Sequence, residues 1–152
     1  MDSKSRDLYF VAVKLFLRDG DKLLITHDIF GAWDLPGGRI KKDEFETSLE
    51  SVIKRKIREE LGPAVKYELG DPNVFFRIER SEHTLGGQKV RIFAVGYDAK
   101  YKGGKVQLGD YHDKMEWVDV KSFQPEDYFT DGWLTGVQEY FKKTVIMHKE
   151  QQ

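Results

Sequence analysis

The chain has 152 residues, of which 39% are hydrophobic and 13% aromatic, a composition that argues against disorder and predicts one domain over residues 1–152. Its 25 basic and 26 acidic residues nearly cancel, so no overall field indicates a nucleic acid polymer as partner. The chain has no cysteine, which excludes disulfides, thiolate metal sites and cysteine nucleophiles.

The first third of the chain favours strands, because it is rich in aromatic and β-branched residues. Residues 1–7 have no apolar core of the kind found in a secretory signal, and no apolar run reaches transmembrane length, so we expect a cytoplasmic protein with no membrane partner. Strands are predicted at 8–17, 22–26 and 33–35, and the last leads into Pro36-Gly37-Gly38. Glycines allow backbone geometry closed to other residues and let a ligand approach closely.

A helix is predicted next, from Glu46 or Thr47 to Leu61-Gly62, with Thr47 and Glu50 fitting a capping box. Its apolar residues recur at spacings of three and four: Leu49, Val52, Ile53, Ile57 and Leu61. At about 100° per residue, this apolar arc is centred on the direction of Glu60. An unpaired buried charge is costly, so Glu60 requires a cation from the chain or a bound metal.

The rest of the chain predicts further strands and a closing helix. The predicted strands are 64–69, 73–79, 89–98 and 115–120, with a turn at Leu85-Gly86-Gly87 and another at 102–105. A loop at 123–131 precedes a helix from Gly132 to about Met147. One helix among mixed strands, followed by a terminal helix, predicts an α+β fold.

The stretch from Gly38 to Gly62 resembles the Nudix box, G-x5-E-x7-R-E-U-x-E-E-x-G-U, where U is a bulky apolar residue. Gly38 and Glu44 match its opening, and the second half is matched by Arg55, Ile57, Glu59, Glu60 and Gly62. The resemblance implies the Nudix fold, an α/β/α sandwich with a mixed β-sheet between helices. It also implies a metal-dependent hydrolase that cleaves the diphosphate linkage of a nucleoside diphosphate derivative.

By this resemblance, Gly37, Glu59 and Glu60 are the expected ligands of Mg²⁺ or Mn²⁺, which prefer hard oxygen donors. The expected catalytic residues are Glu59, Glu60, Arg55 and Glu44, with Arg55 holding the loop glutamate in a salt bridge. The expected partner is a nucleoside diphosphate-type small molecule; neither a nucleic acid polymer nor a membrane is expected, and a homodimer is left open.

The sequence departs from the family pattern at three places. Ten residues instead of seven separate Glu44 from Arg55, so Glu44 and Glu46 are alternatives for the family glutamate. Lys56 replaces a glutamate that in the family helps to hold metal or position water. Lys56 can pair with Glu60 one helical turn away or contact a substrate phosphate. Tyr111 stands where many members carry a glutamate.

Two further residues are candidates for substrate contact. Asp110 neighbours Tyr111 and can replace the missing carboxylate, or it is simply a solvated loop acid. Trp33 can stack on a base, or it belongs to the core. Because three acidic positions are changed or displaced, a second hypothesis stays open: a Nudix-fold protein with weak or no catalysis that binds a nucleotide as a sensor or scaffold.

Overall fold

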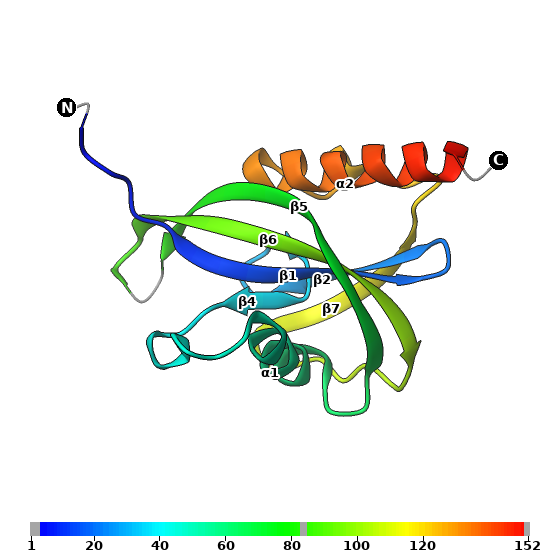
Figure 1. The fold of residues 1–152 in the computed structure, drawn as a ribbon, viewed down its shortest axis with the longest axis horizontal. Helices are drawn as coiled ribbons and strands as arrows, with labels where there is room; N and C mark the ends of the chain where they lie inside the picture. Colours follow the sequence, from blue (N-terminus) through cyan, green and yellow to red (C-terminus); the bar gives the residue numbers. More distant parts are fainter. Residues whose placement is uncertain (1–3, 83–84, 151–152) are drawn as a thin grey trace.

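The structure is a mixed sheet that lies between two helices (Figure 1), which confirms the predicted α/β/α arrangement. The computed structural model describes residues 4–82 and 85–150, with side chains of the last helix as far as Thr144. Within these ranges no helix has both the length and the apolar character needed to cross a membrane.

The sheet has seven strands in the described residues, and their order places Pro36-Gly37-Gly38, called the glycine turn below, beside the first strand. The strands are β1 (Phe10–Asp19), β2 (Lys22–Asp28), β3 (Trp33–Asp34), β4 (Gly37–Arg39), β5 (Lys66–Glu82), β6 (Gln88–Gly103) and β7 (His112–Asp119). The main order is β3-β2-β1-β6-β5, while β4 pairs with β1 and β7 pairs with β2. β1 and β6 run parallel, and the other pairs are antiparallel.

The two helices cover opposite faces of this sheet (Figure 1). α1 (Leu49–Leu61) packs on the face that carries Val13 and Leu15 of β1, and α2 (Asp131–Glu150) packs on the face that carries Ala12 and Phe16. This follows from the two-residue period of a strand, which sends neighbouring side chains to opposite faces. Lys14 therefore lies on the α2 face, although it is among apolar residues.

The start of α1 differs from the prediction. The helix begins at Leu49, and its N-cap is Ser48, whose hydroxyl accepts a hydrogen bond from the Ser51 N–H at 3.2 Å. The expected capping box of Thr47 and Glu50 was wrong, because the Thr47 N–H bonds the Glu44 carbonyl at 3.0 Å. Thr47 thus closes the short 3₁₀ turn at Lys42–Glu44 and does not open the helix.

The predicted strands 64–69 and 73–79 form one strand, β5. It pairs with β6 along its length, with register shifts between Lys66 and Tyr67 and on both sides of Pro72, which has no N–H to donate to the ladder. β6 runs on to Gly103, so the second predicted turn begins later than expected, whereas the turn at 85–87 is confirmed. The predicted loop 123–131 contains a short 3₁₀ helix at Pro125–Asp127.

Candidate functional site

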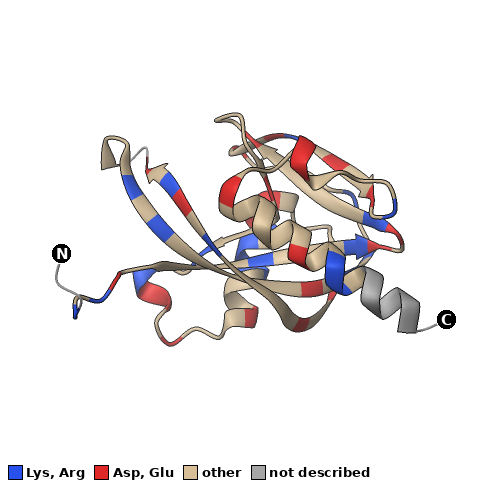
Figure 2. Ribbon diagram, turned by 90° about the horizontal axis from the view of Figure 1, so that it is seen from above, with Lys and Arg blue, Asp and Glu red and all other residues tan. Residues whose placement is uncertain are grey.

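A cleft of about 410 Å³ opens where β1 and β4 meet the end of α1 and the beginning of α2. Its lining includes four cations, Lys14, Arg39, Lys56 and Arg80, and four acids, Asp28, Asp34, Glu60 and Glu82. Aromatic rings of Phe30, Tyr111 and Trp133 border it. Figure 2 shows both signs of charge interspersed along the described part of the ribbon, so charge alone does not mark this cleft.

Glu60 points into the cleft from the end of α1. It is 8% exposed, and its Oε1 accepts a hydrogen bond from the Gly37 N–H at 2.9 Å. Burial raises the pKa of Glu60, and the nearby Asp34 charge raises it further, although the Lys14 ammonium opposes both effects. The apolar arc of the helix therefore predicted the direction of this side chain correctly.

The two glycines of the turn differ in how strictly their surroundings require them, because Gly37 meets backbone and Gly38 meets only the flexible end of Lys56. Gly37 has φ of +135°, and a Cβ built on it would lie 2.0 Å from the Val13 carbonyl oxygen. A Cβ on Gly38 would lie 2.2 Å from Cε of Lys56. The turn thus lets β4 approach β1 closely and lets the stem of Lys56 lie across the backbone.

Arg55 of α1 binds Glu44, which lies in the short 3₁₀ turn between β4 and α1. Its Nε and Nη2 donate to the two carboxylate oxygens of Glu44 at 2.8 and 2.6 Å. The Lys41 N–H also donates to Glu44. The bonds from Arg55 have the largest effect, and together with the Lys41 bond they lower the pKa of Glu44 to about 2. Glu44 is buried while Glu46 is exposed, so Glu44 is the residue that pairs with the arginine.

Lys56 contacts both glutamates at the end of the helix. Its Nζ lies 3.3 Å from Oε2 of Glu59 and 3.6 Å from Oε2 of Glu60. Glu59 also accepts from Nη1 of Arg55 at 3.2 Å, and its side chain is 47% exposed. Glu60 and Lys56 line the cleft, whereas Glu59 lies beside it.

Three residues that the sequence did not single out form a buried charged group on the other side of the turn. Lys14 Nζ lies 3.0 Å from Oδ1 of Asp34 and also donates to the carbonyls of Leu35 and Gly37 at 3.2 and 3.4 Å. His112 Nε2 lies 3.5 Å from Oδ2 of Asp34. Burial alone would raise the pKa of Asp34, but Lys14 and His112 outweigh it and bring the pKa to about 2.

Two predicted substrate residues are not part of this cleft's lining, although one of them, Trp33, lines an adjoining cavity of about 250 Å³ that shares Phe30 and Trp133 with the cleft. The ring of Trp33 packs against the rings of His27 and Tyr128, at centroid distances of 5.0 and 5.1 Å. Asp110 is exposed in the segment before β7 and does not line the cleft. Tyr111 does line it, at the rim, with 67% of its surface exposed.

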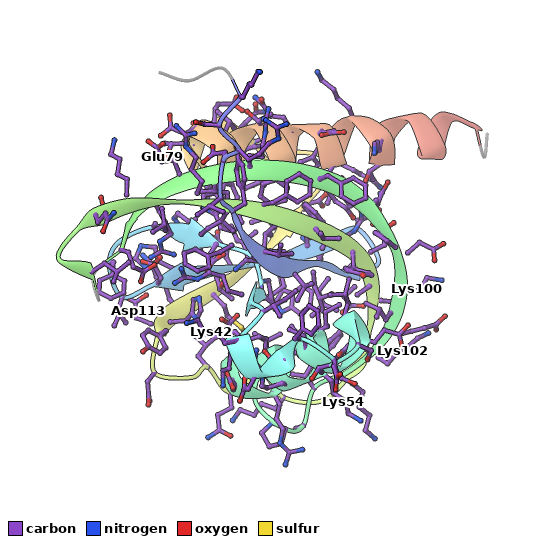
Figure 3. The ribbon with its side chains drawn as sticks, turned by 60° about the vertical axis from the view of Figure 1, so that its left-hand side comes forward. Lys42, Lys54, Glu79, Lys100, Lys102 and Asp113 are labelled. Carbon is purple, nitrogen blue, oxygen red and sulfur yellow. The ribbon has the colours of Figure 1, made fainter. Side chains whose placement is uncertain are left out.

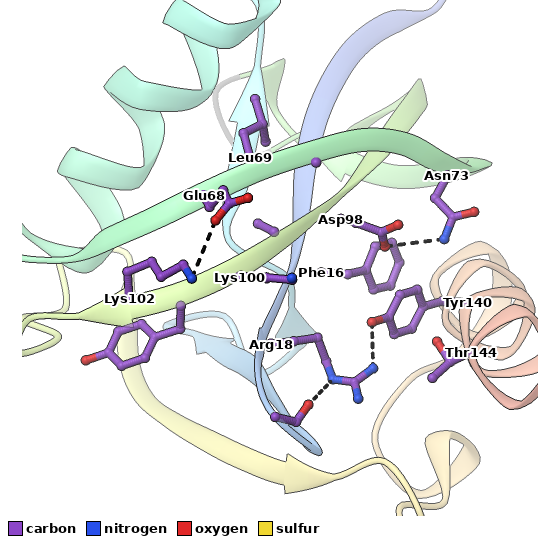
Figure 4. Close-up of a pocket in the computed structure, with 14 residues that line it drawn as sticks. Phe16, Arg18, Glu68, Leu69, Asn73, Asp98, Lys100, Lys102, Tyr140 and Thr144 are labelled. Atoms are coloured by element: carbon purple, nitrogen blue, oxygen red, sulfur yellow. Dashed lines mark hydrogen bonds and ion pairs between the residues drawn. The ribbon is translucent and has the colours of Figure 1, made fainter. Parts of the chain in front are cut away.

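A second cavity, of about 490 Å³, lies at the other end of the sheet (Figure 4). Strands β1, β5 and β6 and helix α2 form it, and its base is the stacked pair of Phe16 and Tyr140. Arg18 donates to the Tyr140 hydroxyl at 2.9 Å, and Asn73 donates to Asp98 at 3.3 Å. None of the residues predicted to act in catalysis lines this cavity.

The oxygen donors around the glycine turn are carboxylates and a carbonyl, the type of ligand that Mg²⁺ and Mn²⁺ prefer. The buried Glu60 carboxylate accepts from the Gly37 N–H, the Gly37 carbonyl accepts from Lys14, and Glu59 is adjacent to Glu60 along the helix. Among the residues that the structure describes, no group of three or more His, Asp or Glu could hold a metal ion. A bound ion would therefore take its other ligands from water and phosphate, as Mg²⁺ commonly does.

A model of the NUDIX domain matches residues 8–134 of the chain. Among solved structures, the chain is similar to a MutT protein from Methanosarcina mazei Go1, at 22% identity and a TM-score of 0.71, over 96% of this chain and 99% of that one. It is also similar to an ADP-ribose pyrophosphatase from Streptococcus suis 89-1591, at 15% identity and a TM-score of 0.63, over 90% and 92%. A third is a UDP-X diphosphatase, at 14% identity and a TM-score of 0.62, over 96% and 67%. A search of curated proteins gave no match.

Proposed function

The chain belongs to the NUDIX domain family, and from this premise we propose that it is a hydrolase that cleaves the diphosphate linkage of a nucleoside diphosphate derivative. The observation that carries the proposal is the buried Glu60 carboxylate, fixed by the Gly37 N–H and facing a cleft with four cations. Two similar solved structures support it, since their names state a pyrophosphatase and a diphosphatase activity.

The cations and rings of the cleft suit the two ends of such a substrate. Phosphate oxygens would be bound by Arg39, Arg80 and Lys56, whose side chains reach the same cavity. Arg39 already pairs with Glu82, its Nη1 lying 2.8 Å from Oε2, which fixes the guanidinium beside the cleft. The rings of Phe30 and Trp133 offer flat apolar surface for a base.

We propose Mg²⁺ or Mn²⁺ as the cofactor, with Gly37, Glu59 and Glu60 as its protein ligands. A divalent cation in this position would neutralise charge on the phosphate oxygens and lower the pKa of a bound water. Arg55 would orient Glu59, and Glu44 would hold Arg55 in place through its two hydrogen bonds. These two residues act as positioning residues in this proposal.

A second candidate function is nucleotide binding with little or no turnover. It is favoured by Lys56, which replaces a family glutamate and contacts both remaining carboxylates. Tyr111 favours it too, because a phenol is a poor base and a poor substitute for a carboxylate ligand.

The test is a screen of nucleoside diphosphate and triphosphate derivatives with Mg²⁺ and with Mn²⁺, measuring release of phosphate or a mononucleotide. We expect turnover of at least one compound, and Glu60→Gln should lower it by about 100-fold or more. Asp98→Asn is the matched control, since it removes a carboxylate from the second cavity and should leave turnover unchanged. Ligand binding without turnover across the whole screen would favour the second candidate.

A further inference from the structure

Lys56 occupies an unusual position in the proposed site. Its ammonium lies within 3.6 Å of both glutamates proposed as metal ligands, and its side chain is 21% exposed. Its stem lies across Gly38, where a Cβ would come within 2.2 Å of Cε of Lys56. The two carboxylates therefore already share a cation supplied by the chain.

We propose that Lys56 is an internal counter-ion that keeps Glu59 and Glu60 from a divalent cation until a diphosphate enters the cleft. The ammonium then moves from the carboxylates to the phosphate oxygens, and the carboxylates become available to the metal. Metal and diphosphate consequently bind with positive cooperativity. This inference rests on the proposed function, because it assumes that the cleft receives a diphosphate.

Coulomb repulsion makes the two cations compete. A divalent ion that took oxygens of Glu59 and Glu60 would come within a few ångströms of an ammonium held at 3.3 and 3.6 Å from the same carboxylates. The ammonium must therefore leave, or the metal binds weakly. A lysine can leave at small cost, because its charge sits on a flexible four-carbon stem with three rotatable donors.

The other cations near the turn do not suit this exchange. Lys14 is buried and bound to Asp34 and two carbonyls, all of which would lose a donor if it moved. Arg55 is held by two bonds to Glu44 and does not line the cleft. Among the described residues, Lys56 alone both contacts Glu59 and Glu60 and reaches the cleft.

A diphosphate supplies the alternative partner. It brings negative charge into the cavity that Lys56 lines, and charge-assisted bonds to phosphate replace those to the carboxylates. Because binding free energies are reciprocal, the diphosphate must strengthen metal binding by the same factor by which metal strengthens diphosphate binding.

The first experiment titrates Mn²⁺ alone into the full-length protein by calorimetry. Lys56→Met keeps the unbranched stem over Gly38 and removes the ammonium, so Mn²⁺ affinity should rise about tenfold. Lys54→Met is the matched control, because it removes the same charge from the same helix at an exposed position (Figure 3) outside the cleft. Thermal melts by circular dichroism check that both variants fold.

The second experiment repeats the Mn²⁺ titration with the non-hydrolysable analogue α,β-methylene-ADP. We expect Mn²⁺ affinity to rise about tenfold in the wild type and in Lys54→Met, and to change much less in Lys56→Met. Chelation of Mn²⁺ by free analogue is common to all three proteins, so it cancels in the comparison.

The outcomes separate the inference from the proposed function. Equal Mn²⁺ affinity of the wild type and Lys56→Met, without analogue, would overturn the counter-ion role even if the protein hydrolyses nucleotides. Equal coupling in the two proteins would overturn the exchange. Absence of analogue binding and of turnover in the screen would instead count against the proposed function, while the titration with Mn²⁺ alone still decides the role of Lys56.

Discussion

The two cavities have similar volumes but hold their charges differently. In the cleft of about 410 Å³, the side chains of Lys14 and Asp34 are only 8% and 14% exposed, and the pair lies beside the buried Glu60. In the cavity of about 490 Å³, the pair of Lys102 and Glu68 is 52% and 64% exposed (Figure 4). The exposed pair of the larger cavity is therefore an ordinary surface ion pair, while its half-buried Asp98 is hydrogen-bonded to Asn73.

This difference supports the cleft as the proposed site for a charged ligand. Burying charges is costly unless they are paired and hydrogen-bonded, so a buried charged group requires a constrained arrangement around it. The glycine turn supplies that arrangement in the cleft, because its N–H and carbonyl bind Glu60 and Lys14. Cavity volume alone would point to the other end of the sheet, away from the residues proposed to act.

The largest expected effect is on the free energy of unfolding, and it should distinguish Lys14 of the cleft from Lys102 of the other cavity. Lys14→Met leaves the Asp34 carboxylate buried without its ammonium, so the free energy of unfolding should fall by about 3–5 kcal/mol. Lys102→Met breaks an exposed pair and should change it by less than about 1 kcal/mol. Urea denaturation of both variants measures the difference, and equal losses would contradict the contrast between the cavities.

A smaller effect is expected on nucleotide affinity. If Phe30 stacks on the base, Phe30→Ala should weaken binding of α,β-methylene-ADP about tenfold, since such stacking contributes about 1–3 kcal/mol. Phe75→Ala is a matched control because both rings are 52% exposed, and Phe75 lies outside the cleft. Fluorescence titration provides the measurement, and unchanged affinity in Phe30→Ala would remove this ring from the binding site.

The smallest effect is expected from pH, at the Glu44–Arg55 pair beside the cleft. The pKa of Glu44 is about 2, below its ordinary 4.5, because Arg55 and then the Lys41 N–H stabilise the carboxylate. The unfolded chain therefore binds the proton first, and the stability from this group is present above pH 4.5 and lost as the pH falls toward about 2.

Urea unfolding across this acid range tests the effect. Glu44→Gln should reduce the loss of stability on acidification, because the group that titrates differently in the two states is gone. Glu46→Gln, which changes an exposed glutamate two residues along, should keep the wild-type pH dependence. A wild-type profile in Glu44→Gln would show that this pair contributes nothing to acid sensitivity.

Local sequence patterns were sufficient to predict much of the fold and the part of the candidate site that contains Glu60 and the glycine turn. The helical spacing of the apolar residues predicted that Glu60 points inward, and the motif placed the glycine turn beside it. The fold class and most of the strands and helices also followed from periodicity and turn residues, except that β4 was not predicted and β5 was predicted as two strands. The roles proposed for the site residues remain predictions that the experiments above address.

The missed residues depend on contacts between distant segments. A lysine among apolar residues in β1 was a visible signal, but its partner Asp34 lies across the sheet, and no local spacing connects the two. Trp33 and Asp110 are not part of the cleft lining, although Trp33 lines an adjoining cavity, so their proposed contact with substrate stays a prediction. The predicted start of α1 was wrong because both Thr47 and Ser48 are suitable N-cap residues. The Thr47 N–H bonds the carbonyl of Glu44 in the preceding 3₁₀ turn, so Ser48 is the N-cap.

The parallel pairing of β1 with β6 also has a consequence for folding during synthesis. β1 is the central strand beside β2 and β4, yet its other neighbour begins only at Gln88. The glycine turn and α1 therefore leave the ribosome well before β6 has been synthesised and can pair with β1. Contacts of such long sequence separation slow folding and leave apolar surface exposed in the nascent chain. We expect the emerging first half to be a substrate for chaperones until β6 has left the exit tunnel.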